Sequence, residues 1–463
     1  IIGIITTIIP IIGSLLNGAI NCDSAYYLSM VERIADGYVP YKTLHLGYTP
    51  LWFYINVFLK SIFGISYGQY EFYLFIHYCF QLGCAFFLYK IARCFSLSII
   101  YSLFASWLFI IMTHWLQGNV ILLEIPSVFF GLLGCWFALK YEKGIAFHYL
   151  WIGIISACSF LCKQFGFGFF FLTIYLMLIS SQYQLKQKLF WFVLGYSLSI
   201  GCCFFLFGQE FISIIFSGYG TETAKSAGYD VSFMAKLLSI KNNLLYYIKR
   251  VVPMLILVFC FFLPIIRQKK WKHTIFCILG ILGFSLQYYF VQGGWHYALY
   301  MTPFSVLFIS ILLSLRLSKI GRFICLFGCV VTVFLSVYST YHNRVYKHYL
   351  NSREKMEQKN IGYLVEKNIP QGCSLWIVHG GIYYVYYLTN RMPPNIATIG
   401  YSFGPLGLSE EQGRKQAEVA DFVLRFSKDY TFETFFTSDL KKHVEQHPFV
   451  MIQDSTILLH DCR

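Results

Sequence analysis

Long apolar stretches alternate with short polar segments through most of this 463-residue chain. Each stretch has roughly 16–20 residues, which is enough to cross a lipid bilayer or nearly so. The pattern therefore predicts about eleven transmembrane helices. They lie near residues 1–20, 69–89, 97–114, 120–139, 147–162, 165–181, 189–207, 251–266, 274–291, 297–315 and 323–340.

The first apolar stretch is interpreted as a retained anchor, because no small-residue cleavage site of a signal peptide follows it. The chain starts at Ile1 rather than Met, so we expect that a few residues, basic in character, precede it.

Charge in the short connecting loops predicts the orientation. Five of these loops hold thirteen basic residues and one acid, Glu142. Loops with an excess of Lys and Arg face the cytoplasm. The basic residues are Lys90, Arg93, Lys140, Lys143, Lys186, Lys188, Arg267, Lys269, Lys270, Lys272, Arg316, Lys319 and Arg322. We therefore expect a cytoplasmic N-terminus in a plasma membrane, the inner membrane if the source is bacterial. The loops 21–68 and 208–250 and the tail are then extracytoplasmic.

Composition agrees with a membrane protein and excludes one other class. Hydrophobic residues make up 57% of the chain and charged residues 13%, far from the balance of soluble domains. The net charge is +14, but residues 1–341 hold 22 basic against 9 acidic residues, and 342–463 hold 14 against 13. The surplus therefore lies in the membrane part, where it sets orientation, and no nucleic-acid partner is predicted.

The pattern changes after residue 341 and predicts a second domain over 342–463. Strand-like runs occur at 374–378, 449–452 and 456–459, and helical patterns at 410–427 and 438–446. Strands alternating with helices indicate a small α/β domain. It lacks a glycine-rich phosphate loop, and we expect it to shape an acceptor site or to add stability.

Most of the fifteen cysteines lie within predicted spans. Cys22, Cys373 and Cys462 alone are expected to face an oxidising compartment, and a disulfide between two of them is left open.

The segment after the first span carries a spaced motif. It reads Asp23, Tyr26, Ala35, Gly37, Pro40-Tyr41 and Tyr48-Thr49-Pro50. This arrangement resembles the first outer loop of the GT-C glycosyltransferases, multi-pass enzymes that take a sugar from a polyprenyl-phosphate carrier. The resemblance implies GT-C architecture for 1–341 and a catalytic base at Asp23. Ser24 departs from the family, whose members often carry a second acid next to the Asp.

Asp23 also has a purely structural interpretation. Asp-Ser-Ala-Tyr-Tyr is a good helix start, so Asp23 could cap a following helix. A carboxylate at a membrane surface is nevertheless costly unless it is used. The downstream motif makes us favour the base, and the two roles can coexist.

Further candidates lie on the predicted outer side. Glu124 has apolar neighbours and precedes Pro126, and the resemblance implies that it positions the acceptor or a metal. Lys163 would neutralise the lipid phosphate, with Gln164 beside it as a substrate-binding residue. The alternatives are an interfacial or ion-paired Glu124 and a snorkelling Lys163.

Aromatic groups complete the predicted site. His296 is a candidate for the donor phosphate, with Trp295 and Tyr297 as sugar-binding neighbours, although an interfacial aromatic belt explains this group equally well. Tyr48 is a substrate-binding candidate and lies where some relatives have a phosphate-binding Lys. The loop 208–250 is interpreted either as a mobile cover over the donor or as a connector.

The resemblance implies an integral-membrane enzyme. It would transfer a hexose-type sugar, with inversion, from a polyprenyl (undecaprenyl or dolichyl) phosphate to an extracytoplasmic glycan, lipid or protein acceptor. No cofactor is predicted, and a divalent metal is not favoured because Asp23 and Glu124 alone make a poor site for Mg or Mn. The alternatives are a polytopic transporter or flippase and a non-catalytic protein that binds lipid-linked glycans.

Overall fold

The computed structural model describes 8, 11–16, 18–44, 46–116, 120–180, 184–209, 211–212, 262–290, 295–321, 323, 326–327, 353–378, 384–389, 391, 418–427, 438–452 and 457–463. These residues divide into two compact units. The helical unit holds those within Ile1–Leu16, Leu74–Leu206 and Phe233–Leu350. The loop–tail unit holds those within Asn17–Tyr73, Phe207–Ser232 and Asn351–Arg463.

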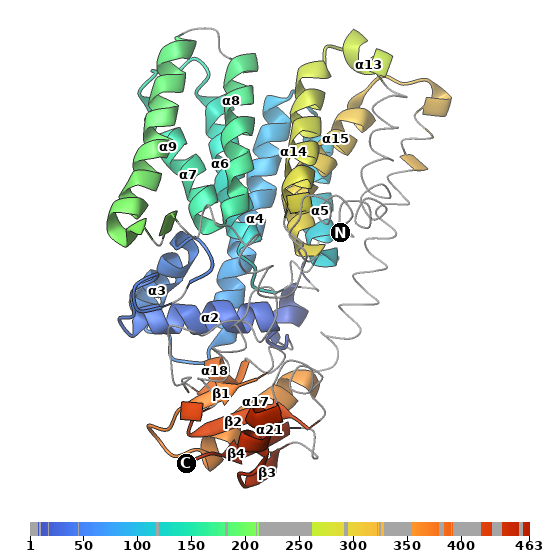
Figure 1. Ribbon diagram of the computed structural model, residues 1–463. Helices are drawn as coiled ribbons and strands as arrows, with labels where there is room; N and C mark the ends of the chain where they lie inside the picture. Colours follow the sequence, from blue (N-terminus) through green and yellow to red (C-terminus); the bar gives the residue numbers. More distant parts are fainter. Residues whose placement is uncertain are drawn as a thin grey trace. The chain divides into compact units, whose positions relative to one another are not determined.

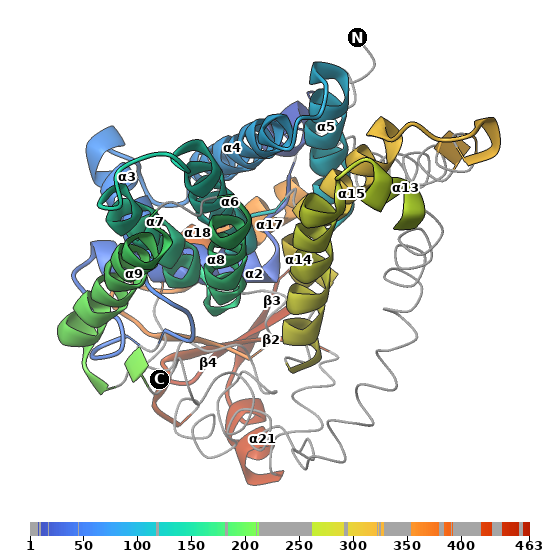
Figure 2. The same cartoon turned by 90° about the horizontal axis from the view of Figure 1, so that it is seen from above.

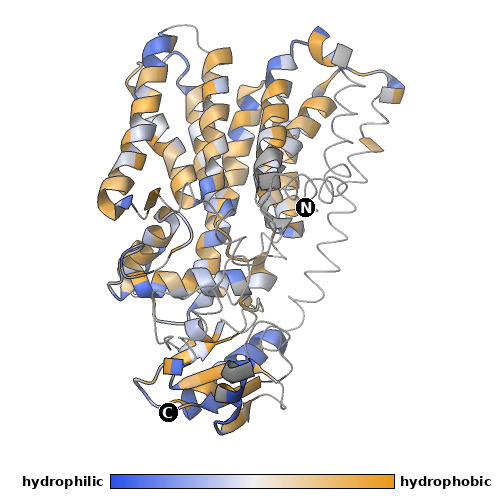
Figure 3. Cartoon of the chain, viewed as in Figure 1, coloured by the Kyte–Doolittle hydropathy of each residue, from blue (hydrophilic) through white to orange (hydrophobic). Residues whose placement is uncertain are grey.

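The helical unit is built from apolar helices (Figures 1 and 3). They are α4 (Tyr70–Cys94, from Leu74 onward), α5 (Ile99–Trp115), α6 (Glu124–Lys140), α7 (His148–Cys162), η1 (Gln164–Phe167), α8 (Gly168–Ser180), α9 (Leu185–Phe207), α13 (Phe262–Arg267), α14 (Trp271–Phe290), η3 (Trp295–Tyr300) and α15 (Thr302–Ser314). The predicted stretches from 69 to 207 and from 274 to 315 thus form helices within about five residues of their expected ends. Helical structure is therefore confirmed for these stretches.

Helix length tests the expected spans more strictly. In the described part of the chain, α4 and α9 are long and apolar enough to cross a membrane. Six other apolar helices have 10–17 fully described residues, among them 271–285 of α14. In the first expected span, residues 11–16 are helical and 18–20 are not. Residues 251–261 and 328–340 of two further expected spans lie outside the described residues, as does nearly all of the loop 208–250.

Close helix packing inside the helical unit depends on small residues, as is typical of membrane helices. Figure 2 shows α6, α7, α8 and α9 gathered together. A Cβ atom on Gly153 of α7 would lie 2.1 Å from the Phe192 carbonyl oxygen of α9, and one on Gly195 of α9 would lie 2.1 Å from that of Leu150. The two helices therefore approach backbone to backbone, which a larger side chain at either glycine would prevent.

The loop–tail unit combines the first outer loop with the C-terminal region. Its helices are α2 (Cys22–Ala35), α3 (Leu51–Phe63), α17 (Arg353–Asn368), α18 (Tyr384–Thr389) and α21 (Ser438–Glu445). Its strands are β1 (Leu375–Ile377), β2 (Phe422–Phe426), β3 (Phe449–Ile452) and β4 (Ile457–Asp461). The sheet order is β1-β2-β4-β3, with β1 and β2 parallel and the other pairs antiparallel. The tail therefore has the expected mixture of strands and helices, while its existence as a separate domain over 342–463 stays a prediction.

One tail prediction is wrong. Residues 410–427 were expected to be helical. Residues 418–419 are helical, but 422–426 form β2, and 410–417 lie outside the described residues. Phe422, Val423 and Leu424 are buried between β1 and β4. Pairing on both edges of the strand supplies hydrogen bonds that outweigh local helical preference. The predicted strands at 374–378, 449–452 and 456–459 and the helix at 438–446 are confirmed by β1, β3, β4 and α21.

Candidate functional site

Asp23 lies in the first turn of α2, inside the helix rather than at its cap. The cap is Asn21, whose side-chain oxygen accepts a hydrogen bond of 2.8 Å from the Ser24 backbone N–H. The capping role considered for Asp23 therefore belongs to Asn21. An acidic side chain in the first turn of a helix interacts favourably with the helix dipole.

The rest of the motif folds the chain back after α2. Gly37 follows the helix with φ +98°, a conformation that side chains other than glycine rarely adopt. The Tyr38 N–H bonds the Arg33 carbonyl across this turn at 3.0 Å, a Schellman-type helix end. Tyr41 then donates its hydroxyl to the Tyr48 carbonyl at 2.6 Å, and Pro50 leads into α3. The recognised spacing is thus the spacing of a compact α2–turn–α3 connection.

An aromatic cluster lies on the α2 turn that follows Asp23. Tyr26, Tyr27 and Tyr48 meet edge to face, with ring centroids 5.3–6.1 Å apart. Burial raises the pKa of Tyr26 to about 12, against a smaller opposite effect of its hydrogen bond to the Gly47 backbone. The Tyr48 ring is only 4% exposed, so it contributes packing to this unit. Its role in substrate binding stays a prediction.

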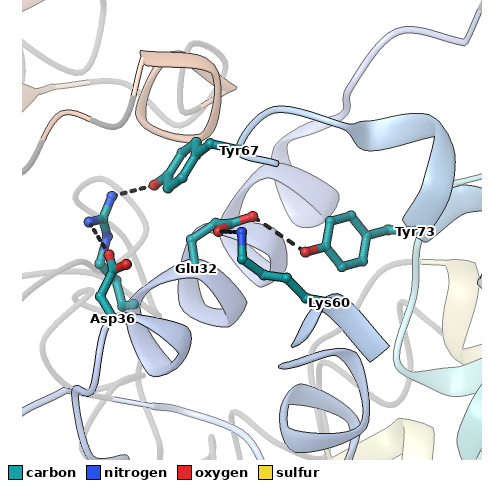
Figure 4. A network of polar contacts seen from close by, with 6 residues as sticks. Glu32, Asp36, Lys60, Tyr67 and Tyr73 are labelled. Atoms are coloured by element: carbon teal, nitrogen blue, oxygen red, sulfur yellow. Dashed lines mark hydrogen bonds and ion pairs between the residues drawn. The ribbon is translucent and has the colours of Figure 1, made fainter. Parts of the chain in front are cut away.

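A charged network that the sequence analysis missed joins α2 to α3 (Figure 4). Glu32 is buried and accepts hydrogen bonds from Lys60 of α3 at 2.5 Å and from the Tyr73 hydroxyl at 3.4 Å. Burial raises the pKa of Glu32, and the interaction with Lys60 only partly opposes that rise. Next to it, Arg33 bonds Asp36 at 3.1 Å and also the Tyr67 hydroxyl.

A sequence signal for this network existed. Glu32 and Arg33 are adjacent opposite charges within the otherwise apolar run after Tyr26, and Lys60 is alone in the apolar α3 segment. Charged residues on apolar segments are rarely buried unless they are paired.

Glu124 and Lys163, predicted separately, form one ion pair in the helical unit. Glu124 begins α6 and is 0% exposed, and Lys163 is the C-terminal cap of α7 and is 1% exposed. Below the pair, the Ser127 hydroxyl donates to the Ser159 carbonyl at 2.8 Å, and the Ser159 hydroxyl returns a bond of 2.7 Å to the Ser127 carbonyl. The ion pair and the serines hold the ends of α6 and α7 together.

The other candidates of the helical unit are near in the fold. Gln164 follows Lys163 directly as the first residue of η1, which packs against α6 and α7. Trp295, His296 and Tyr297 are in η3, whose backbone packs against α6, while their side chains lie outside the described residues. Asp23 and Tyr48 belong to the loop–tail unit.

Metal and disulfide chemistry depend on how the His, Cys, Asp and Glu residues of the described ranges are placed. No group of three or more His, Cys, Asp or Glu is placed to hold a metal ion there. Cys373 and Cys462 are free thiols. The expectation that no metal is used remains untested.

Comparisons with known proteins identify the fold. No protein-family model and no curated protein matches the sequence. The ArnT of Cupriavidus metallidurans bound to undecaprenyl phosphate matches with a TM-score of 0.52 and 11% identity, over 98% of this chain and 96% of that one. The Archaeoglobus fulgidus oligosaccharyltransferase in complex with Zn and sulfate matches with a TM-score of 0.53 and 12% identity, over 100% and 73%. Both neighbours are GT-C glycosyltransferases, and this chain shares the fold of these two structures.

Proposed function

We propose that this protein is an integral-membrane glycosyltransferase that transfers a hexose-type sugar from a polyprenyl phosphate to an extracytoplasmic acceptor. The observation that carries the proposal is the fold match along nearly the whole length of an ArnT that was solved with undecaprenyl phosphate. The acceptor is a glycan, lipid or protein. The oligosaccharyltransferase was solved tethered to an acceptor peptide, so a peptide acceptor occurs on this fold.

The proposed reaction is a single in-line displacement. Asp23 removes the proton of an acceptor hydroxyl while its oxygen attacks the anomeric carbon. The carbon–oxygen bond to the phosphate breaks, the polyprenyl phosphate leaves with the electron pair, and the anomeric configuration inverts. Asn21 caps α2, and Asp23 lies in the first turn of that helix.

The phosphate of the donor is assigned to Lys163 and His296, with Glu124 acting on the acceptor. The ion pair adds a condition to this assignment, since a phosphate has to compete with Glu124 for the Lys163 ammonium. Gln164, Trp295, Tyr297 and Tyr48 are proposed to contact the sugar. The proposed topology has about eleven spans with the tail domain outside the cytoplasm.

The test is Asp23→Asn in the purified full chain, assayed with a polyprenyl-phosphate sugar and an extract of cell-envelope acceptors. The amide keeps the shape of the side chain and cannot take the proton. Turnover should therefore fall about a hundredfold or more, while binding of the lipid donor remains nearly unchanged.

Asp36→Asn is the matched control, because Asp36 is a second carboxylate at the other end of α2. It should retain most of the turnover. Near-normal transfer by Asp23→Asn would show that the base is elsewhere. Lipid binding without transfer in the wild type would favour the non-catalytic alternative, and movement of an intact lipid-linked glycan across the membrane would favour a flippase.

A further inference from the structure

The side chain of Gln358 in α17 forms two hydrogen bonds with the backbone of Ile20, shortly before α2 begins. Its side-chain oxygen accepts a hydrogen bond from the Ile20 backbone N–H, and its side-chain N–H group donates to the Ile20 carbonyl, both at 2.8 Å. The two residues are 338 positions apart in the sequence and are both buried. The primary amide bonds both backbone groups of one residue, as a neighbouring β-strand would. It therefore restrains the peptide groups on both sides of Ile20.

The same face of α17 also holds the far end of the first outer loop. Lys355, three residues before Gln358, forms an ion pair of 2.7 Å with Glu71 at the start of α4. Residues three apart in a helix lie on one face. The loop that carries the GT-C-like motif is thus attached to α17 close to where it begins and close to where it ends.

Helix α18 adds a contact between these two attachments. It packs against both α17 and α2, and the Tyr387 ring stacks on Tyr67 with centroids 6.0 Å apart. Gly362 of α17 permits the close approach, because a Cβ there would already lie 3.3 Å from the Cβ of Leu388. The C-terminal region therefore meets the first outer loop along several of its segments.

We propose that Gln358 is a positioning residue for Asp23, and that the C-terminal region serves the reaction by fixing the catalytic loop. The proposal rests on the proposed function. Ile20 directly precedes Asn21, the residue that caps α2, and Asp23 follows in the first turn. A displacement of Ile20 is passed through one peptide bond to the cap residue Asn21 and through two more to Asp23. A misplacement of about 1 Å at a reacting group can cost up to a hundredfold in rate.

The experiment compares Gln358→Met and Gln358→Glu with the wild type in the full chain, reconstituted in nanodiscs. Met keeps the length of the side chain and removes both hydrogen bonds. Glu retains an acceptor for the Ile20 N–H and loses the donor to the Ile20 carbonyl. Glu357→Gln is the control, because Glu357 lies next to Gln358 and forms an ion pair with the exposed Arg353.

Hydrogen exchange of residues 18–26 gives a readout that needs no substrate. Exchange of the Ile20 amide should become at least tenfold faster in Gln358→Met, less so in Gln358→Glu, and should not change in Glu357→Gln. Unchanged exchange at Ile20 in both Gln358 variants would overturn the proposal.

Kinetic measurements test whether the hydrogen bonds between Gln358 and Ile20 affect the reaction through Asp23. Gln358→Met should lower kcat about tenfold and leave the KM of the lipid donor within about twofold. Added to Asp23→Asn, it should lower the rate little further, because the group that it positions is already disabled. Equal losses in both backgrounds, or a full kcat despite faster exchange, would contradict a positioning role.

The two proposals can fail separately. A wild-type protein that transfers no sugar from any polyprenyl-phosphate donor overturns the proposed function and the kinetic role of Gln358 together. Normal Asp23-dependent transfer with unchanged exchange at Ile20 overturns the role of Gln358 alone.

Discussion

The ion pairs of the two units differ in how far their partners are exposed to solvent. In the helical unit, Glu124 and Lys163 are both withdrawn from solvent and neutralise each other among apolar helices. In the loop–tail unit, each ion pair described above keeps at least one partner in contact with solvent. Lys60 is 19% exposed beside the buried Glu32, and Asp36 is 45% exposed beside the buried Arg33.

This difference predicts different sensitivities to mutation. Removal of one partner from a fully buried pair leaves a charge that water cannot reach, which is strongly destabilising. Removal of one partner from a half-exposed pair lets water replace it at little cost. In the helical unit, substitution of either Glu124 or Lys163 should therefore be strongly destabilising. In the loop–tail unit, the polar stabilisation should be distributed over several contacts, among them the hydrogen bonds of Gln358.

The largest effect on stability is expected at Lys163. Lys163→Met keeps the apolar stem and leaves the Glu124 carboxylate uncompensated, so the free energy of unfolding should fall by about 3–5 kcal/mol. Urea unfolding in detergent, followed by far-UV circular dichroism, measures the loss. The double variant Lys163→Met/Glu124→Gln should recover most of it, because no net charge then remains buried.

If Lys163→Met alone lowered the free energy of unfolding by less than about 1 kcal/mol, the proposed difference between the two units would be wrong. Donor affinity measured in the stable double variant separates the two roles of Lys163. If Lys163 also binds phosphate, lipid binding should remain weak there although the fold is restored.

The next effect concerns pH and Glu32. Because burial raises the pKa of Glu32 in the folded state, its contribution to stability is fully present below its unfolded pKa of about 4.3 and is lost as pH rises through the folded value. Glu32→Gln removes this titration and keeps an acceptor for Lys60. Relative to wild type, the variant should therefore gain stability as pH rises from about 4 to 8.

Thermal unfolding over this pH range checks the prediction for Glu32, with Tyr73→Phe as the control that keeps the carboxyl and removes one hydrogen bond. A difference between Glu32→Gln and wild type that stays constant with pH, or falls as pH rises, would contradict it.

The hydrophobic pattern of the sequence predicted those helices and strands whose state depends mainly on neighbouring residues. Apolar runs located α4 to α9, α14 and α15, and the alternating tail segments located β1, β3 and β4. Strand β2 was missed because its short apolar run has no distinct period, and pairing with strands distant in the sequence decides its state. Helix α2 was expected only as the helix that Asp23 could cap, and α3 was not predicted because its 13 residues are shorter than a membrane span.

For the candidate site, the sequence indicated individual residues but not the contacts between them. Glu124 and Lys163 each stood out as a charge in an apolar context, yet the 39 positions between them hid their pairing. Asp23 was placed correctly at a helix start, and the cap at Asn21 was not foreseen. The bond between Ile20 and Gln358 leaves no periodic signal at all, because a single glutamine in a polar helix has the same appearance whether or not it binds a distant peptide.

The smallest effect is expected at the second attachment of α17. Lys355→Glu and Glu71→Lys should each cost about 0–1 kcal/mol, because the Glu71 side chain is 42% exposed and water can replace its partner. The exchange of both residues should restore the wild-type value, and Arg353→Glu on the exposed surface of the same helix serves as the control. Thermal unfolding together with hydrogen exchange at residues 70–74 measures both quantities. Loss of more than about 2 kcal/mol from either single reversal, or no recovery in the exchanged pair, would mean that this contact is desolvated like Glu124–Lys163, and that the two units do not differ in the way described.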